Sequence, residues 1–144
     1  MLYCLMALKE VSGKKVNLSR AFKDIAFGLK RNSITKDSGV VKNENAIKQA
    51  IRCLVLTQKG ERLFQPDIGC AVFELLFEPL DLMTADAVRD EIINTLNQYE
   101  PRISLIDVTV NISEVYSRFD VTVEYRIVGQ PIVESVDFVL KRPE

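Results

Sequence analysis

The chain has 144 residues, of which 47% are hydrophobic and 27% are charged, and its formal net charge at pH 7 is -1. A chain of this length and composition is expected to form one globular domain that needs no metal or disulfide support. It contains no histidine, which excludes Ser-His-Asp and Cys-His catalysis and His-ligated zinc. Neither common Gly-rich phosphate loop is present, so no cofactor is expected.

The two halves of the chain carry opposite charge. Residues 1–60 hold 12 Lys and Arg against 4 Asp and Glu, a net charge of +8, whereas residues 61–144 hold 7 against 16, a net charge of -9. Such polarity fits a subunit whose two ends contact different neighbours, but folding can equally mix the two kinds of side chain. The basic residues are scattered singly with few aromatic residues between them, so no nucleic-acid partner is expected.

The first 21 residues are predicted to be an N-terminal extension of unassigned role, and residues 22–144 the folded domain. Residues 1–8 are almost all apolar, but no basic segment precedes them, so they do not indicate a signal peptide. No segment approaches the roughly 20 apolar residues of a membrane span, so no membrane partner is expected. Three cysteines, Cys4, Cys53 and Cys70, have no metal-ligand spacing and suit buried thiols in a reducing cytoplasm.

The first half of the predicted domain contains one clear helix. Residues 24–27 and the segment after the turn at 36–39 are predicted to be two short strands. A helix is predicted from an Asn43 N-cap to Gly60, because apolar residues recur at helical spacing from Ile47 to Val55. Pro66 and Gly69 then interrupt the chain, and residues 72–77 are predicted to form an apolar turn or a short helix.

The second half contains another helix and three strands. Thr84 is predicted to cap a helix that Pro101 ends, and its apolar face comprises Ala85, Val88, Ile92, Leu96 and Tyr99. From Ile103 onward apolar residues alternate with polar ones in three runs, joined at residues 113–118 and 129–131. The predicted fold class is therefore α+β: an antiparallel β-meander packed by two main helices, with two open sheet edges.

Two sequence blocks stand out near the ends of the two helices. The first is residues 57–70, TQKGERLFQPDIGC, and the second is residues 99–103, YEPRI. In this order they resemble the signature of the small baseplate wedge protein of contractile-tailed phages, a family also called baseplate assembly protein W. The resemblance runs from about residue 24 to residue 103. The related subunit of bacterial secretion-system baseplates differs in its host machinery, and the sequence does not distinguish the two.

The resemblance implies a structural protein of the virion tail baseplate, made in the host cytoplasm and without enzymatic activity. Its fold should resemble the C-terminal domain of the tail sheath subunit. Six copies are expected around the tail tube, with wedge core-bundle proteins and the tail sheath protein as partners. The last strand, residues 134–140, is the candidate edge for starting sheath assembly by strand exchange. Without the resemblance, this segment would be an ordinary C-terminal strand.

The second block contains the main candidate interface residues. Pro101 has no backbone N–H and pushes Glu100 toward an extended conformation, so helix and strand should meet at a fixed elbow. The resemblance implies that Glu100, Pro101 and Arg102 contact the wedge core bundle. The residues alone indicate a helix stop with a surface ion pair worth about 0–1 kcal/mol.

The first block is predicted to be a helix end followed by a loop. Gly60 suits the left-handed residue that closes a helix, and Lys59 would complement the helix dipole there. Phe64 is expected to anchor the loop in the core. Lys59 and Arg62 are treated as further candidate interface residues.

The alternative function is enzymatic: a peptidoglycan-degrading, lysozyme-like hydrolase, a label that relatives of this family carry. Such chemistry needs a pair of carboxyl groups, for which Glu61, Asp67, Glu74 and Glu78 are the candidates. The chain has no tryptophan, and its aromatic residues fall mostly at core positions, so no aromatic-rich sugar cleft is expected.

Overall fold

A computed structural model describes residues 22–31, 33–34, 36–113 and 117–141. The predicted extension, residues 1–21, lies outside this part of the chain. The elements in chain order are β1 (Lys23–Ile25), β2 (Val40–Lys42), α2 (Glu44–Leu56), α3 (Val72–Leu75), α4 (Leu82–Tyr99), β3 (Ile103–Ser113), β4 (Arg118–Ile127) and β5 (Val133–Lys141). No helix in the described part of the chain has both the length and the apolar character required to cross a membrane.

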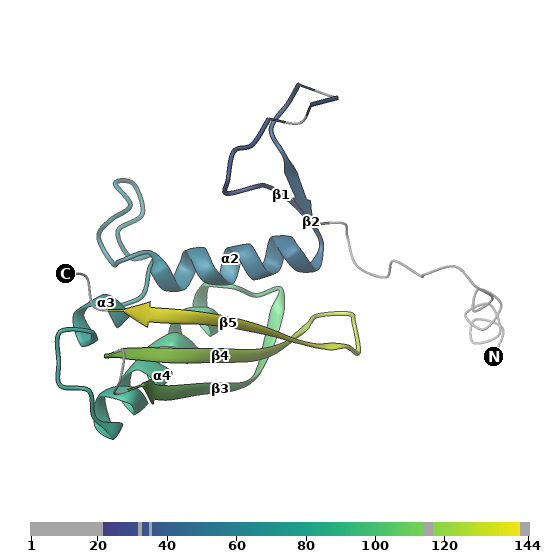
Figure 1. The fold of residues 1–144 in the computed structure, drawn as a ribbon. Coiled ribbons are helices and arrows are strands. Elements are labelled where there is room, and N and C mark those ends of the chain that lie inside the picture. Colours follow the sequence, from purple (N-terminus) through teal and green to yellow (C-terminus); the bar gives the residue numbers. More distant parts are fainter. Residues whose placement is uncertain (1–21, 32, 35, 114–116, 142–144) are drawn as a thin grey trace, which may run out of the picture.

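The described strands form two separate antiparallel sheets (Figure 1). β1 and β2 make a hairpin that projects from the body of the molecule, whereas β3, β4 and β5 form a meander in that order. β4 is central, so β3 and β5 are the two edges. The predicted α+β fold, with an antiparallel meander and two main helices, is confirmed.

The core lies between the meander and the two long helices. Along β4 every second side chain is buried, from Phe119 to Ile127, which is the period of a strand with one face on a core. The helices contribute Ile47, Ile51 and Val55 from α2 and Val88, Ile92 and Leu96 from α4. Removal of this apolar surface from water is the main force that holds the two layers together.

The two long helices begin differently from the sequence prediction. Asn43 occupies the N-cap position of α2, but its side chain makes no capping hydrogen bond and its backbone has a φ of 51°. α4 begins at Leu82, and its N-cap is Asp81, whose carboxylate accepts a hydrogen bond from the Thr84 N–H at 2.7 Å. The prediction of Thr84 as the cap was wrong, because Thr84 is the residue whose N–H is capped.

The end of α2 also differs from the prediction. The helix ends at Leu56, and the Thr57 hydroxyl donates to the Cys53 carbonyl at 2.6 Å. Gly60 has the expected positive φ of 86°, but it lies in the following loop, where its N–H donates to the Pro66 carbonyl. The helix stops earlier because Thr57 adopts an extended conformation. Cys53, expected to be buried, is exposed.

The side chain of Tyr125 places a hydroxyl group inside this apolar core. It is fully buried in β4, and its hydroxyl makes no hydrogen bond to a described residue; burial raises the pKa of Tyr125 to about 12. Because a buried hydroxyl without a partner costs stability, we expect Tyr125→Phe to leave the free energy of unfolding unchanged or to raise it by up to about 1 kcal/mol. Urea unfolding followed by circular dichroism measures this difference.

Tyr99→Phe is the matched control. The Tyr99 hydroxyl donates to the Asp67 carbonyl at 2.6 Å, so its removal should lower the free energy of unfolding by about 0.5–1.5 kcal/mol. An equal loss in both variants would show that the Tyr125 hydroxyl contributes a hydrogen bond after all.

Candidate functional site

The second sequence block forms the junction between α4 and β3. α4 ends at Tyr99, and Glu100 is its C-cap, with a φ of -122° and a ψ of 76°. The Glu100 N–H still donates to the Leu96 carbonyl, which completes the last helical turn. Pro101 follows in an exposed turn and ends the helix as predicted, because it lacks an N–H and restricts the residue before it.

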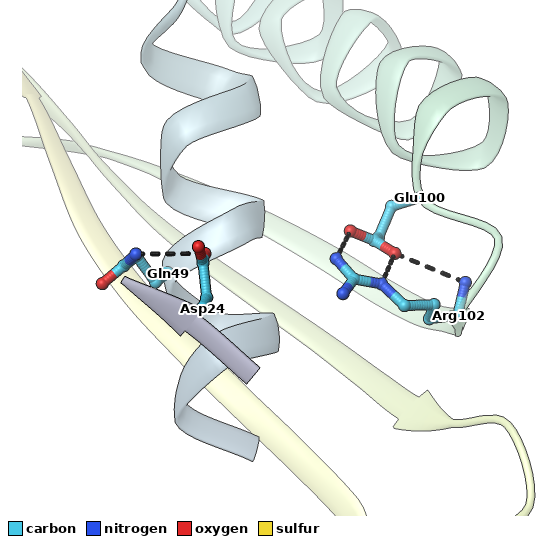
Figure 2. A network of polar contacts seen from close by, with 4 residues as sticks. All are labelled: Asp24, Gln49, Glu100 and Arg102. Carbon is cyan, nitrogen blue, oxygen red and sulfur yellow. Dashed lines mark hydrogen bonds and ion pairs between the residues drawn. The ribbon is translucent and has the colours of Figure 1, made fainter. Parts of the chain in front are cut away.

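Glu100 and Arg102 form a bidentate ion pair across Pro101 (Figure 2). The Arg102 Nε and Nη2 atoms each donate to a carboxylate oxygen of Glu100 at 2.5 Å. The Glu100 side chain is 4% exposed, whereas that of Arg102 is 35% exposed. The hydrogen bonds to Glu100 raise the pKa of Arg102. The expectation of a weak surface ion pair was therefore wrong, because the carboxylate is buried.

Phe22 fixes the orientation of the Arg102 guanidinium. The guanidinium carbon lies 5.3 Å from the centre of the Phe22 ring, which is the distance of a cation–π contact. Phe22 packs against the edge of the core, and its carbonyl accepts a hydrogen bond from the Asn43 N–H at 2.8 Å. The residue just before β1 is thus part of the site at the end of α4.

Gln49 attaches the hairpin to α2. Its Oε1 atom accepts from the Phe27 N–H at 3.2 Å, and its Nε2 atom donates to the Ile25 carbonyl at 2.7 Å. Nε2 also donates to Asp24 at 3.1 Å (Figure 2). The side-chain amide therefore pairs with the backbone of the hairpin as a neighbouring strand would. The sequence analysis missed this role, since a single glutamine on the polar face of a helix carries no signal of it.

The first sequence block, residues 57–70, forms a loop closed by its own backbone. The Cys70 N–H donates to the Thr57 carbonyl at 2.8 Å. Gly69 has a φ of 146°, and a Cβ atom there would lie 2.8 Å from the Thr57 carbonyl oxygen, so this closure requires glycine. Because the backbone closes the loop, no apolar anchor is needed. Phe64 is 96% exposed, and its predicted position in the core was wrong.

Lys59 is held against the body of the molecule, whereas Arg62 is exposed in the loop. The Lys59 Nζ atom lies 2.5 Å from Glu91 Oε1 of α4, and the same oxygen accepts from the Ala71 N–H at 3.1 Å. The hydrogen bond from Lys59 lowers the pKa of Glu91, and the same bond raises the pKa of Lys59. Lys59 thus fastens the loop to α4. Because α2 ends at Leu56, Lys59 is outside its last turn, and the prediction that it complements the dipole of that helix was wrong.

The two sequence blocks meet along α4. Tyr99, next to the Glu100 site, donates its hydroxyl to the Asp67 carbonyl in the loop, 32 residues earlier in the chain. Glu91 holds the other end of the loop through Lys59. This contact was not predicted from the sequence, because each block forms a separate local pattern and no pattern links the two.

A groove of about 850 Å3 lies between α2 and β5. On its wall, the Arg52 Nη2 atom donates to the Asp137 carbonyl at 2.9 Å. In an antiparallel strand the N–H and C=O of one residue point to the same side, and this side alternates along the strand. The backbone groups of Asp137 therefore point away from β4 and toward α2. The same holds for the residues two positions before and after it, Ser135 and Val139.

Two of the four carboxylates of the enzymatic alternative line separate hollows. Glu61 lines the groove between α2 and β5, whereas Glu78 lines a separate hollow of about 160 Å3. All four side chains, Glu61, Asp67, Glu74 and Glu78, are exposed. Within the described ranges, no group of three or more Cys, Asp or Glu side chains could hold a metal ion.

Comparisons with known proteins gave matches over most of the chain. The family model described as Baseplate wedge protein gp25 matches residues 41–132. The Baseplate wedge protein gp25 of Enterobacteria phage T4 is 33% identical over 110 residues, which cover 76% of this chain and 81% of that protein.

Several solved structures have the same fold, and two of them illustrate the range of sources. The crystal structure of a putative tail lysozyme from Geobacter sulfurreducens has a TM-score of 0.65 and 28% identity, with 70% of this chain and 92% of that chain covered. A chain of the baseplate complex from the type VI secretion system has a TM-score of 0.58 over 69% of this chain and 93% of that chain. Its identity is 18%, so it shows the fold alone.

Arg102→Ala should leave the buried Glu100 carboxylate without its cation. We expect the free energy of unfolding to fall by about 1–3 kcal/mol, measured by urea unfolding. Arg89→Ala is the control, because the Arg89–Asp107 pair is exposed on both sides and should contribute less. A smaller loss for Arg102→Ala than for Arg89→Ala would contradict a buried, paired Glu100.

The Lys59–Glu91 pair predicts a pH dependence. The pKa of Glu91 is lowered from 4.5 in the folded state, so its contribution to stability is present above that value and is lost as the pH falls through the folded-state pKa. We expect Glu91→Gln to be less stable than the wild type at about pH 6, and this difference to narrow as the pH falls below the unfolded-state pKa of about 4.3. Asp90→Asn, an exposed neighbour on α4, is the control and should not reproduce this convergence.

Proposed function

This chain belongs to the family of the baseplate wedge protein gp25, a structural component of contractile baseplates, and we propose how it joins its neighbours there. It binds wedge core-bundle proteins through Glu100, Pro101 and Arg102, and it starts the tail sheath through the free edge of β5. In this proposal six copies surround the tail tube after synthesis in the host cytoplasm, and the chain has no catalytic activity.

The proposed contact with the wedge core bundle is supported by the unequal exposure of the two side chains in the Glu100–Arg102 ion pair. Glu100 is buried, whereas Arg102 is about one-third exposed and held in one orientation by Glu100 and Phe22. An arginine has five N–H donors, and Glu100 uses two of them. The others can donate to a partner's carboxylate or carbonyl groups, and little side-chain entropy is lost because the guanidinium is already fixed.

The groove beside β5 supports the second contact. Ser135, Asp137 and Val139 present their backbone groups toward α2, so a strand entering the groove can pair with them and replace the hydrogen bond from Arg52. Before docking, the Arg52 side chain shields this edge, which limits wrong pairing between free copies.

The other edge of the meander is less suited to strand addition. β3 has a register shift between Leu105 and Asp107 in its pairing with β4, and such bulges bend a strand and interrupt regular pairing. This irregularity favours β5 as the edge that accepts the sheath strand.

The hydrolase alternative lacks support of this kind. Glycoside hydrolysis needs two carboxyl groups about 5–9.5 Å apart across one cleft. Glu61 and Glu78 line different hollows, and neither Asp67 nor Glu74 lines either of them. The lysozyme name belongs to the Geobacter sulfurreducens relative and transfers no catalytic residue to this chain.

Ser135→Pro tests the docking of the sheath strand. The Ser135 N–H points away from β4, so proline removes no hydrogen bond within the meander, and edge strands tolerate it there. We expect a folded protein with a circular dichroism spectrum like that of the wild type. In phage assembled with the variant, the fraction of baseplates that carry sheath should fall by roughly tenfold in electron micrographs.

Val136→Pro is the control for the direction of the backbone groups. Val136 is buried and its N–H points toward β4, so this variant should fail to fold. Sheathed particles at the wild-type frequency with Ser135→Pro would remove β5 from the proposal.

A further inference from the structure

The hairpin of β1 and β2, described at residues 22–31, 33–34 and 36–42, projects from the body of the molecule (Figure 1). It carries several large apolar side chains that are exposed. Single exposed apolar residues are ordinary on a protein surface, but here Ile25, Phe27, Leu29, Ile34 and Val40 are all more than half exposed on one small element. A two-stranded hairpin alone is only marginally stable in water. Exposed apolar side chains gathered on one element are typical of a surface that another protein covers.

The same hairpin is basic. Its cations are Lys23, Lys30, Arg31, Lys36 and Lys42, and its acids are Asp24 and Asp37, which gives five positive charges against two negative ones. Both carboxylates accept hydrogen bonds from the hairpin itself, Asp24 from the Ile25 N–H and Asp37 from the Ser38 N–H. A surface that complements the hairpin is therefore acidic and carries apolar side chains.

The base of the hairpin is continuous with the Glu100–Arg102 site. Phe22, which precedes β1, lies against the Arg102 guanidinium. Gln49 holds Asp24 and Ile25 in place at the same end of the hairpin. A partner that reaches Arg102 therefore meets the hairpin beside it. The family model covers only residues 41–42 of this element.

We propose that the hairpin and Arg102 form one binding surface for a single partner, an acidic face with an apolar strip on the wedge core-bundle protein. This inference rests on the proposed role of Glu100, Pro101 and Arg102. The hairpin contributes apolar contact and charge attraction, and Arg102 contributes directional hydrogen bonds.

Binding of the full chain to the wedge core-bundle proteins of the same particle tests the inference. These proteins are co-expressed, and the retained chain is quantified after affinity purification. Ile25→Ser/Leu29→Ser should reduce retention by about tenfold, and Lys30→Glu by roughly fivefold. Phe27 is left unchanged because it also lines the groove beside β5.

The matched controls replace exposed residues of the same kinds elsewhere. Leu82→Ser/Met83→Ser removes two apolar side chains that are about as exposed, at the start of α4. Arg126→Glu reverses an exposed charge on β4. Both controls should be retained within about twofold of the wild type. Circular dichroism confirms that every variant is folded at the temperature of the measurement.

The outcomes separate this inference from the proposed function. If Arg102→Ala loses binding while the hairpin variants bind like the wild type, the inference is wrong and the role of Arg102 stands. If the core-bundle proteins do not retain the wild-type chain, both are wrong. If the hairpin variants instead lose only self-association in sedimentation experiments, the partner is a second copy and the inference is wrong.

Discussion

Burial of the Glu100 carboxylate at the end of α4 is the constraint on which the rest of the site depends. A buried carboxylate is costly unless a cation is held against it, and Arg102 supplies that cation through two hydrogen bonds. Pro101 between them fixes the turn that makes this pairing possible. Phe22 then covers the guanidinium. One ion pair thus brings together the end of α4, the start of β3 and the base of the hairpin.

α2 connects the two surfaces that we assign to partners. Gln49 faces the hairpin, whereas Lys48 and Arg52, four residues apart and therefore on one side of the helix, contact β5. Phe27 of the hairpin also lines the groove beside β5. A strand that enters this groove consequently contacts the same helix that holds the hairpin beside Arg102. The two contacts are adjacent in the fold, although one uses residues near 25 and the other residues near 137.

Features that depend on local sequence patterns were predicted from the sequence, whereas contacts between residues far apart in the chain were not. The alternation along β4, the apolar face of α4 and the stop at Pro101 each follow from short-range periodicity or from proline geometry, and they were predicted. Thr84 and Phe64 were assigned from residue type, but Asp81 is the better placed cap and the loop around Phe64 closes through its backbone. The role of Gln49 depends on contacts with hairpin residues more than 20 positions earlier in the chain, so no local pattern predicts it.

The opposite charges of the two halves of the chain are partly mixed by folding and partly kept apart. On α2 and in the following loop they mix, because Lys48 pairs with Glu134 and Lys59 pairs with Glu91. On the hairpin they stay separate, since among the described residues no ion pair joins its Lys and Arg side chains to a carboxylate of the second half. The hairpin is basic and apolar, and its charges are not paired with those of the second half. Its exposed side chains therefore contribute little to the stability of the isolated fold. Its composition is explained better by a partner than by the stability of the free chain.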